Sequence, residues 1–201
     1  MEIRHIKASG LITNNWPGGT TTQLAIYPDN AEYKKLDFLF RISTATVEAE
    51  ESTFTKLPGV SRKIMILDGE IKIEHENHHS KILKKFEQDE FSGGWDTKSY
   101  GKATDFNVMT TGNTFGDLEA ISLLKDEQYQ FKKSKNYDFL VLYAYTGIFK
   151  FKTENHSYSI ENGDVLIIYS EEIDKPFLIE SMSTSEIITT RISINKQNAD
   201  Y

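Results

Sequence analysis

The sequence predicts an all-β protein made of many short strands. Most apolar segments alternate with a period of two and are rich in β-branched and aromatic residues, as at residues 38–43, 70–74 and 147–152. Asp-Gly, Thr-Gly, Asn-Gly and Pro-Gly turns separate the segments, and no long segment keeps the apolar period of about 3.6 residues that marks a helix. Short strands between turns are typical of a sandwich or a barrel.

An internal repeat predicts two domains of the same kind. Residues 67–91 and 145–167 each contain a glycine turn, an alternating strand, a polar hairpin tip and an aspartate turn that starts the next strand. This order resembles the sequence motifs of the cupin jelly roll, and two copies at similar spacing predict a bicupin of two tandem cupin-like jelly-roll barrels. Turn residues in the middle of the chain divide it into a first barrel, residues 1–112, and a second barrel, residues 113–201.

Composition limits the classes of function. The chain has 201 residues, a net charge of −7 and no cysteine. Its lysines are interspersed with acidic residues, so no basic stripe could follow a phosphate backbone, and nucleic acid is not an expected partner. The absence of cysteine excludes disulfides and thiolate chemistry. No apolar run approaches the about 18 residues of a membrane span and no signal-peptide pattern is seen, so we expect a soluble cytoplasmic protein without a membrane partner.

The histidines do not form the metal-binding pattern of cupins, in which two histidines one residue apart act with a following acid and a third histidine. After Gly69 come His75, His78 and His79, which fall at or near the expected hairpin tip, away from the barrel interior. Adjacent residues on a strand point to opposite faces, so His78 and His79 cannot both reach one ion. The chain also lacks a Gly-x-Ser-x-Gly elbow. We therefore expect no metal, no cofactor and no catalytic triad.

Two local features indicate a ligand site. Arg41 lies in a clear strand with apolar side chains on the opposite face, while its own face carries Ser43 and Ala45. A guanidinium inside a barrel needs an anion, and either a protein carboxylate such as Asp105 or a ligand could supply it. Trp16 is followed by two glycines and three threonines, a concentration of residue types that often contact ligands.

Three ordered motifs resemble those of the HutD/Ves family. They are Trp-Pro-Gly-Gly-Thr-Thr-Thr-Gln-Leu at 16–24, Arg-Ile-Ser-Thr-Ala at 41–45 followed by Phe-Thr-Lys-Leu-Pro-Gly-Val-Ser-Arg at 54–62, and Asp-Phe-Asn-Val-Met at 105–109. On these motifs the chain is identified as a member of the HutD/Ves family. The first motif is shorter than the family's pattern and has Gln23 where the family often has glutamate.

The resemblance implies a fold, a role and a site. It implies a bicupin without the cupin metal ligands, to which no catalytic activity is firmly attached. Some members are thought to regulate histidine utilisation by binding an intermediate such as N-formylglutamate or urocanate, and others are described as stress-inducible. It also implies a ligand pocket in the first barrel, contributed by Trp16, Thr21, Arg41, Ser43, Arg62, Asp105 and Asn107.

Three functions follow from these observations. The leading prediction is a non-enzymatic protein that binds or senses a small anionic metabolite, such as a formylglutamate-like or urocanate-like carboxylate, because Arg41 lies within a strand and no metal or triad pattern is present. The second is a metal-independent enzyme such as an isomerase, which cupin-like barrels can support by acid–base chemistry alone. The third is an interaction module whose pocket is vestigial.

Overall fold

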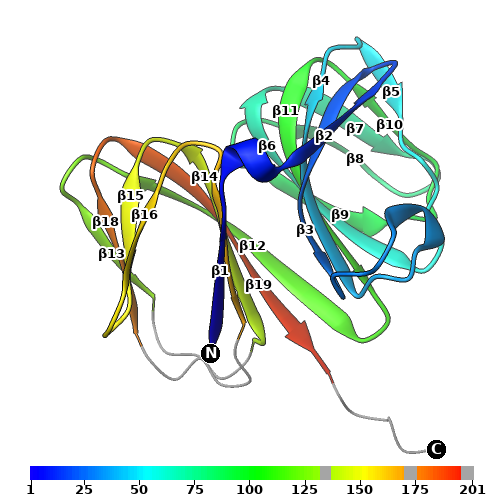
Figure 1. Ribbon diagram of the computed structural model, residues 1–201. Coiled ribbons are helices and arrows are strands. Elements are labelled where there is room, and N and C mark those ends of the chain that lie inside the picture. Colours follow the sequence, from blue (N-terminus) through cyan, green and yellow to red (C-terminus); the bar gives the residue numbers. More distant parts are fainter. Residues whose placement is uncertain (132–136, 170–175, 196–201) are drawn as a thin grey trace, which may run out of the picture. The chain divides into compact units, whose positions relative to one another are not determined.

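The computed structural model describes residues 1–131, 137–169 and 176–195 (Figure 1). Within this part of the chain the regular structure is almost entirely strand, and the helical elements are two short 3-10 turns, η1 (Ala8–Gly10) and η2 (Tyr33–Lys35). No helix in the described ranges is long and apolar enough to cross a membrane. The predicted all-β class is confirmed.

The chain forms two compact units. One unit is Ile12–Thr114, and the other combines Met1–Leu11 with the chain from Phe115 onward. Each unit contains one larger and one smaller sheet, and none of the four sheets in the described residues closes on itself. Their outermost strands have a hydrogen-bonded neighbour on one side only, so the sheets are open where the sequence predicted closed barrels.

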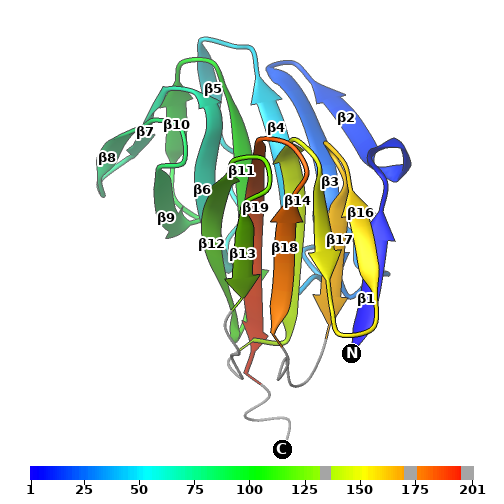
Figure 2. The same ribbon diagram turned by 90° about the vertical axis from the view of Figure 1, so that its left-hand side faces the viewer.

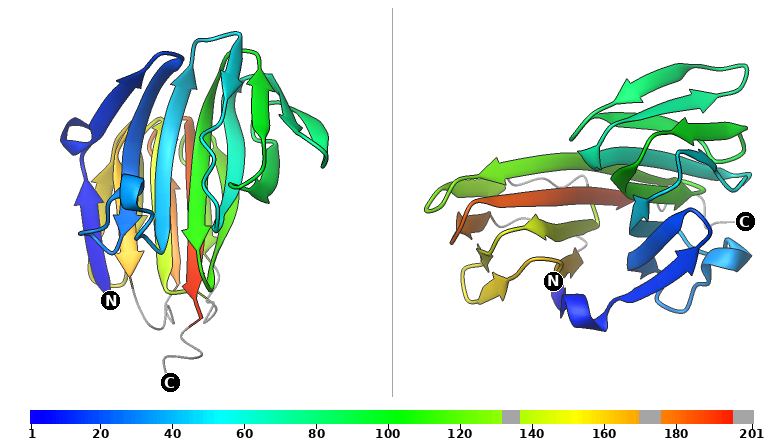
Figure 3. Two further views of the ribbon diagram at one scale, coloured as in Figure 1. Left: turned by 90° about the vertical axis from the view of Figure 1, so that its right-hand side faces the viewer. Right: turned by 90° about the horizontal axis from the view of Figure 1, so that it is seen from above.

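The unit Ile12–Thr114 carries most of the residues expected to form a site. Its larger sheet contains, in spatial order, β2 (Ile12–Trp16), β3 (Gly19–Tyr27), β4 (Phe40–Val47), β11 (Ala103–Thr111), β6 (Val60–Gly69) and β9 (Gln88–Ser92). Its smaller sheet contains β5 (Glu51–Thr53), β10 (Thr97–Tyr100), β7 (Ile71–His75) and β8 (Ser80–Leu83). Figure 3 shows the strands of this unit from two further sides. Ile64 and Ile66 of β6 pack with Ile71 and Ile73 of β7, which joins the two sheets through a common core.

The other unit is built in the same way. Its larger sheet contains β1 (Glu2–Ile6), β17 (Val165–Tyr169), β14 (Phe139–Thr146), β19 (Ser185–Ile194) and β12 (Thr114–Leu123). Its smaller sheet contains β13 (Gln128–Phe131), β18 (Phe177–Ser181), β15 (Phe149–Lys152) and β16 (Ser157–Ile160), and faces the viewer in Figure 2. Leu140 and Leu142 of β14 pack with Phe149 and Phe151 of β15 in its core.

Strand β1 changes the predicted division of the chain. It pairs with β17 along its whole length, from Glu2 opposite Tyr169 to Ile6 opposite Val165 (Figure 2). The first eleven residues therefore belong to the C-terminal unit, whereas the sequence placed them in a first domain of residues 1–112. The observed division between Thr114 and Phe115 lies two residues after the expected one.

The internal repeat is seen in two equivalent glycine turns. Gly69 joins β6 to β7 with a φ of 83°, and Gly147 joins β14 to β15 with a φ of 82°. A Cβ on Gly69 would lie 2.4 Å from the backbone oxygen of Lys102, and a Cβ on Gly147 would lie 2.4 Å from that of Thr184. Both turns need glycine, because both combine left-handed backbone with a close approach.

Candidate functional site

One face of the six-stranded sheet collects buried polar and charged side chains. Residues that pair directly across antiparallel strands point to the same side of a sheet. One row across β4, β11 and β6 is Arg41, Met109 and Arg62. The next rows on this side are Gln23, Ser43, Asn107, Ile64 and Asp89, then Thr21, Ala45, Asp105 and Ile66.

We call the central part of this surface the arginine face and define it by Arg41, Ser43, Arg62, Asp105 and Asn107. Each of these five residues is between 3% and 7% exposed. Five of the seven residues predicted for the pocket are therefore buried together on three neighbouring strands.

Arg41 is held by neutral groups. Its Nε donates to Gln23 Oε1 at 2.9 Å, and its Nη1 donates to Ser43 Oγ at 3.1 Å. The ring of Tyr33 covers the guanidinium, with 4.3 Å between the guanidinium carbon and the ring centroid. No carboxylate among the described residues forms an ion pair with Arg41, so the alternative in which Asp105 pairs with it is wrong.

Arg62 is linked to Asp105 through an amide. Arg62 donates to Asn107 Oδ1 from Nη2 at 3.0 Å and from Nε at 3.3 Å. Asn107 Nδ2 donates in turn to Asp105 Oδ1 at 3.2 Å. The rings of Phe54 and Phe91 flank the guanidinium of Arg62, with their centroids 4.9 and 5.1 Å from its central carbon. Asn107 therefore forms hydrogen bonds with both charged groups, but as a neutral amide it cancels the charge of neither.

Burial shifts the ionisation of all three charged groups on the arginine face. It lowers the pKa of Arg41, and it lowers the pKa of Arg62 to about 10, so Arg62 keeps its charge at neutral pH. A guanidinium group is not deprotonated in proteins, so Arg41 is also a cation. Burial also raises the pKa of Asp105 to about 6, against the hydrogen bond from Asn107 and the charge of Arg62. Two buried cations thus share this face with one carboxyl group, so the local charge is positive even when Asp105 is ionised, and it favours an anion.

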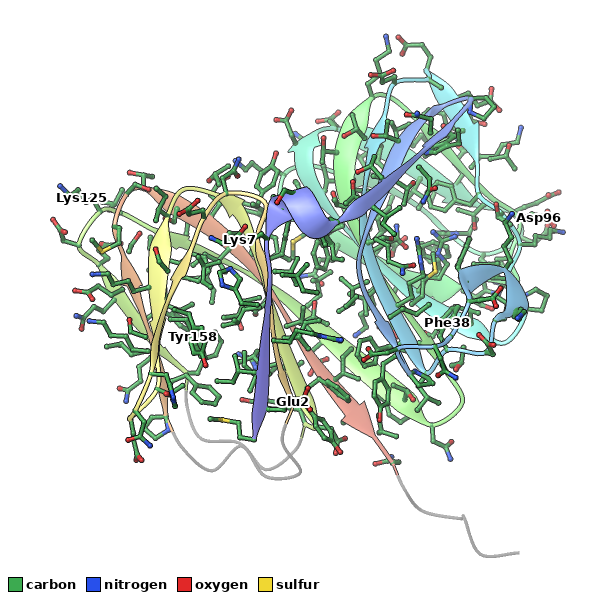
Figure 4. All side chains as sticks on the ribbon, in the orientation of Figure 1. Glu2, Lys7, Phe38, Asp96, Lys125 and Tyr158 are labelled. Carbon is green, nitrogen blue, oxygen red and sulfur yellow. The ribbon has the colours of Figure 1, made fainter. Side chains whose placement is uncertain are left out.

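An apolar cluster lies beside Arg41. Phe38, which Figure 4 labels inside the unit, belongs to this cluster together with Leu57, Val60 and Met109. Tyr33, from η2, stacks on Phe38 with 6.5 Å between ring centroids and also covers Arg41. Sequence reasoning did not identify Tyr33, because a residue in a short turn shows no periodicity. It did not identify Gln23 as the partner of Arg41 either, although Gln23 alternates with Thr21 along β3.

Trp16 and Thr21 lie away from the arginines. Trp16 pairs with Gly19, which pairs with Val47, six residues along β4 from Arg41. At about 3.4 Å per residue this is roughly 20 Å, so the indole does not reach the guanidinium. Trp16 is also 37% exposed. Thr21 is partly buried and lies opposite Ala45, at the edge of the arginine face.

His75 corrects the expectation for the histidines. It continues the inward alternation of Ile71 and Ile73 on β7, and its side chain is 0% exposed. The placement of this histidine at a hairpin tip away from the interior was wrong, because β7 extends to His75 and pairs it with Thr97 of β10. His79 lies in the exposed hairpin, as expected. The period of two over residues 71, 73 and 75 was the signal that could have shown this.

His75, His79 and Asp89 form what we call the His–Asp–His cluster. Asp89 Oδ2 lies 3.0 Å from His75 Nε2 and 2.9 Å from His79 Nε2. Burial lowers the pKa of His75, and although burial acts against it, hydrogen bonds from both histidines hold the pKa of Asp89 below its usual value. Phe91 lies between this cluster and Arg62, with its ring centroid 4.4 Å from that of His75 and 5.1 Å from the Arg62 guanidinium carbon.

A cavity of about 450 Å³ lies elsewhere in the same unit. Its lining consists of Thr46, Val47, Glu48, Asp68, Lys102, Ala103 and Thr104. None of the residues that define the arginine face or the His–Asp–His cluster lines it. The cavity therefore lies apart from the buried charges of the arginine face.

Comparison with known proteins gives a family and a fold. A family model described as HutD matches residues 8–187. A search of curated proteins found no match.

Three solved structures illustrate the fold. PA5104 from Pseudomonas aeruginosa PAO1, described as a conserved protein of unknown function, is 17% identical with a TM-score of 0.82, over 96% of this chain and 100% of that one. HutD from Pseudomonas fluorescens SBW25, in a formate condition, is 15% identical with a TM-score of 0.72, and the match covers 96% of this chain and 98% of that one. A cupin 2 conserved barrel domain protein from Leptotrichia buccalis is 13% identical with a TM-score of 0.56, and the match covers 96% of this chain and 98% of that one. At these identities the likeness shows a cupin-like fold.

Proposed function

Since the HutD model matches residues 8–187, this chain belongs to the HutD family, and we propose that it binds a small anionic metabolite through Arg41 and Arg62 on the arginine face. The observation that carries the proposal is the presence of two buried guanidinium groups without a carboxylate ion pair among the described residues. Leaving such charges uncompensated costs several kcal/mol, and a bound anion would offset that cost.

The surrounding groups favour a carboxylate with further polar atoms. Guanidinium groups bind carboxylates through paired N–H donors, which fixes the orientation of the anion. Arg41 and Arg62 lie two strands apart, with β11 between them, so their side chains can converge on one molecule. Ser43 and Asn107 lie in the row next to them and could bind a carbonyl or amide group of that molecule. A formylglutamate-like or urocanate-like acid matches this chemistry.

We further propose that binding occurs without turnover, so that the protein reports the level of its ligand. This role accords with the family's link to histidine utilisation, and a stress response is the other context to which it could belong. The assignment rests on the arginine face alone, because neither the fold nor the cavity near Lys102 selects a ligand.

A thermal-shift titration tests the proposal. N-formylglutamate, urocanate and glutamate are titrated separately, with chloride and sulfate as simple anions. A specific ligand should raise the melting temperature in a saturable way, since a ligand that binds only the folded state stabilises it by mass action. The Arg41→Met variant should lose this shift.

Arg191→Met is the matched control, because Arg191 pairs with Glu119 in the other unit and should not affect binding. A shift that survives Arg41→Met, or the absence of a shift with every carboxylate tested, would contradict the proposal. If chromatography shows that the ligand is consumed during the titration, the result would support the metal-independent enzyme instead.

A further inference from the structure

We infer that His75, His79 and Asp89 form a binding site for a divalent transition-metal ion. These residues come from the end of β7, from the hairpin after it and from β9. One ligand atom from each lies within 4.8 Å of the other two. The site is independent of the proposed anion binding, because it uses none of the residues that define the arginine face.

The donor set and its spacing suit such an ion. Two imidazole nitrogens and one carboxylate oxygen are ligands that Zn²⁺, Ni²⁺ and Co²⁺ accept. Metal–ligand distances of about 2.0–2.2 Å place two ligands of one ion roughly 3 Å apart. Asp89 Oδ2 is already 3.0 Å from His75 Nε2 and 2.9 Å from His79 Nε2. An ion could replace the hydrogen-bonding protons with only a small movement of the His79 side chain.

Thr97 supports this exchange of a proton for a metal. Its Oγ1 lies 2.8 Å from His75 Nδ1, inside the unit. A carboxylate only accepts hydrogen bonds, so without metal a neutral His75 carries its proton on Nε2, and Nδ1 accepts from the Thr97 hydroxyl. With metal on Nε2 the proton lies on Nδ1, and the same hydroxyl accepts it after rotating. Such a partner orients a histidine ligand in both states.

Two of the three ligands are buried and the third is exposed to solvent. The side chains of His75 and Asp89 are 0% and 8% exposed, whereas that of His79 is 40% exposed. Metal can therefore enter from the side of His79, and the three protein ligands leave coordination positions for water.

The site differs from the cupin pattern of two histidines one residue apart. Its ligands come from β7, from the hairpin that joins β7 to β8, and from β9. His78 is close by but is excluded from the cluster, because its ring stacks on Trp95 with 3.6 Å between centroids.

Trp95 provides a direct probe of the site. Its ring centroid lies 5.6 Å from that of His75 and 6.0 Å from that of His79. The chain has two tryptophans, so in a Trp16→Phe background the intrinsic tryptophan emission comes from Trp95 alone. Titration with Ni²⁺ or Co²⁺ should quench this emission and saturate at one equivalent, and Zn²⁺ should reverse the quenching by competition.

Variants separate this site from adventitious binding. His79→Gln and Asp89→Asn should each weaken the affinity about tenfold or more, and Thr97→Val should weaken it about tenfold, as loss of an outer-shell partner does. His78→Gln should keep the affinity of the parent. His79 is exposed, so His79→Gln should stay folded, and a melting curve of each variant checks this.

Two results would overturn the inference. One is quenching that does not saturate even at millimolar metal. The other is an affinity that falls as much in His78→Gln as in His79→Gln, which would place the metal on the exposed hairpin and not in the cluster.

Discussion

Arg62 donates to the side-chain oxygen of Asn107 from two nitrogens, Nη2 at 3.0 Å and Nε at 3.3 Å. A neutral amide therefore occupies the position in which a buried arginine commonly has a carboxylate. The hydrogen-bonding capacity of Arg62 is partly satisfied, but its charge is not neutralised. The same holds for Arg41, whose side-chain partners are Gln23 and Ser43. Under the proposed function a bound anion would supply the missing negative charge, and each arginine should then respond to mutation in a distinctive way.

Arg41→Met should leave the apo protein nearly as stable as the parent. The change removes a buried charge together with two hydrogen bonds to neutral groups, and it leaves no carboxylate unpaired. We expect the free energy of unfolding in urea to change by about 1 kcal/mol or less. A loss of roughly 3 to 5 kcal/mol, the cost of breaking a buried ion pair, would show that Arg41 has a structural anionic partner.

Asp105→Asn should change how stability depends on pH. The folded-state pKa of Asp105 is about 6 against a usual value of 3.8, so between these values the folded state keeps a proton that the unfolded state has lost. The stability that this proton provides is fully present below about pH 4 and is lost as the pH rises through 6. Asparagine does not titrate, so the parent should lose roughly 3 kcal/mol relative to the variant between pH 3 and pH 7.

Urea unfolding of the parent and Asp105→Asn at several pH values measures this difference. Parallel curves of unfolding free energy against pH would mean that the carboxyl group is hydrated or has a cationic partner. Asp105 would then be ionised over a wider pH range and would offset more of the positive charge of the two arginines.

Arg62→Met should raise the pKa of Asp105 above about 6, because the charge of Arg62 lowers that pKa in the parent. It should also destabilise the fold by about 1 to 3 kcal/mol, since Asn107 Oδ1 loses its buried donor. The titration of Asp105 can be followed by NMR of its carboxyl carbon. Arg41→Met is the control, as Arg41 does not contribute to the shift of Asp105. An equal shift in both variants would show that the charge of Arg62 does not act specifically on Asp105.

Gly69→Ala and Gly147→Ala should destabilise the fold to the same extent if the two units share one design. Each substitution adds a Cβ at a φ near 83° or 82° and 2.4 Å from a backbone oxygen. Gly59→Ala is the matched control, because Gly59 has a φ of 81° but no atom within 4 Å of the added Cβ. Thermal unfolding should show a cost of about 1 kcal/mol for Gly59→Ala and a larger cost for the other two. Equal losses in all three would show that the close approach has no effect.

Asp164→Ala should detach the N-terminal strand. Asp164 accepts hydrogen bonds from the backbone N–H groups of Ala8 at 3.0 Å and Glu161 at 3.1 Å, and it lies 2.8 Å from His5 Nε2 and 3.0 Å from Lys7 Nζ. Loss of this carboxylate should cost roughly 2 to 4 kcal/mol. Hydrogen exchange should accelerate in β1 more than in β14. Unchanged protection of β1 would show that its ladder with β17 holds it without Asp164.

Several features were determined by the sequence alone. The period of two in segments such as 38–43 and the glycine turns at Gly69 and Gly147 are properties of contiguous residues, so they were sufficient to predict the all-β class and the internal repeat. Alternation on one strand likewise placed Arg41 and Ser43 on one face. Three separated motifs carried the resemblance to the HutD/Ves family, which the match over residues 8–187 confirms.

The tertiary structure decided which distant residues meet. The pairing of β1 with β17, the amide partner of Arg41 and the convergence of His75 and His79 on Asp89 all depend on strand order and register. A local pattern tells which face of a strand a side chain occupies, but not which strand lies beside it. Cross-strand partners are chosen by the packing of the whole unit, because a shift of one residue in register would turn every side chain to the other face.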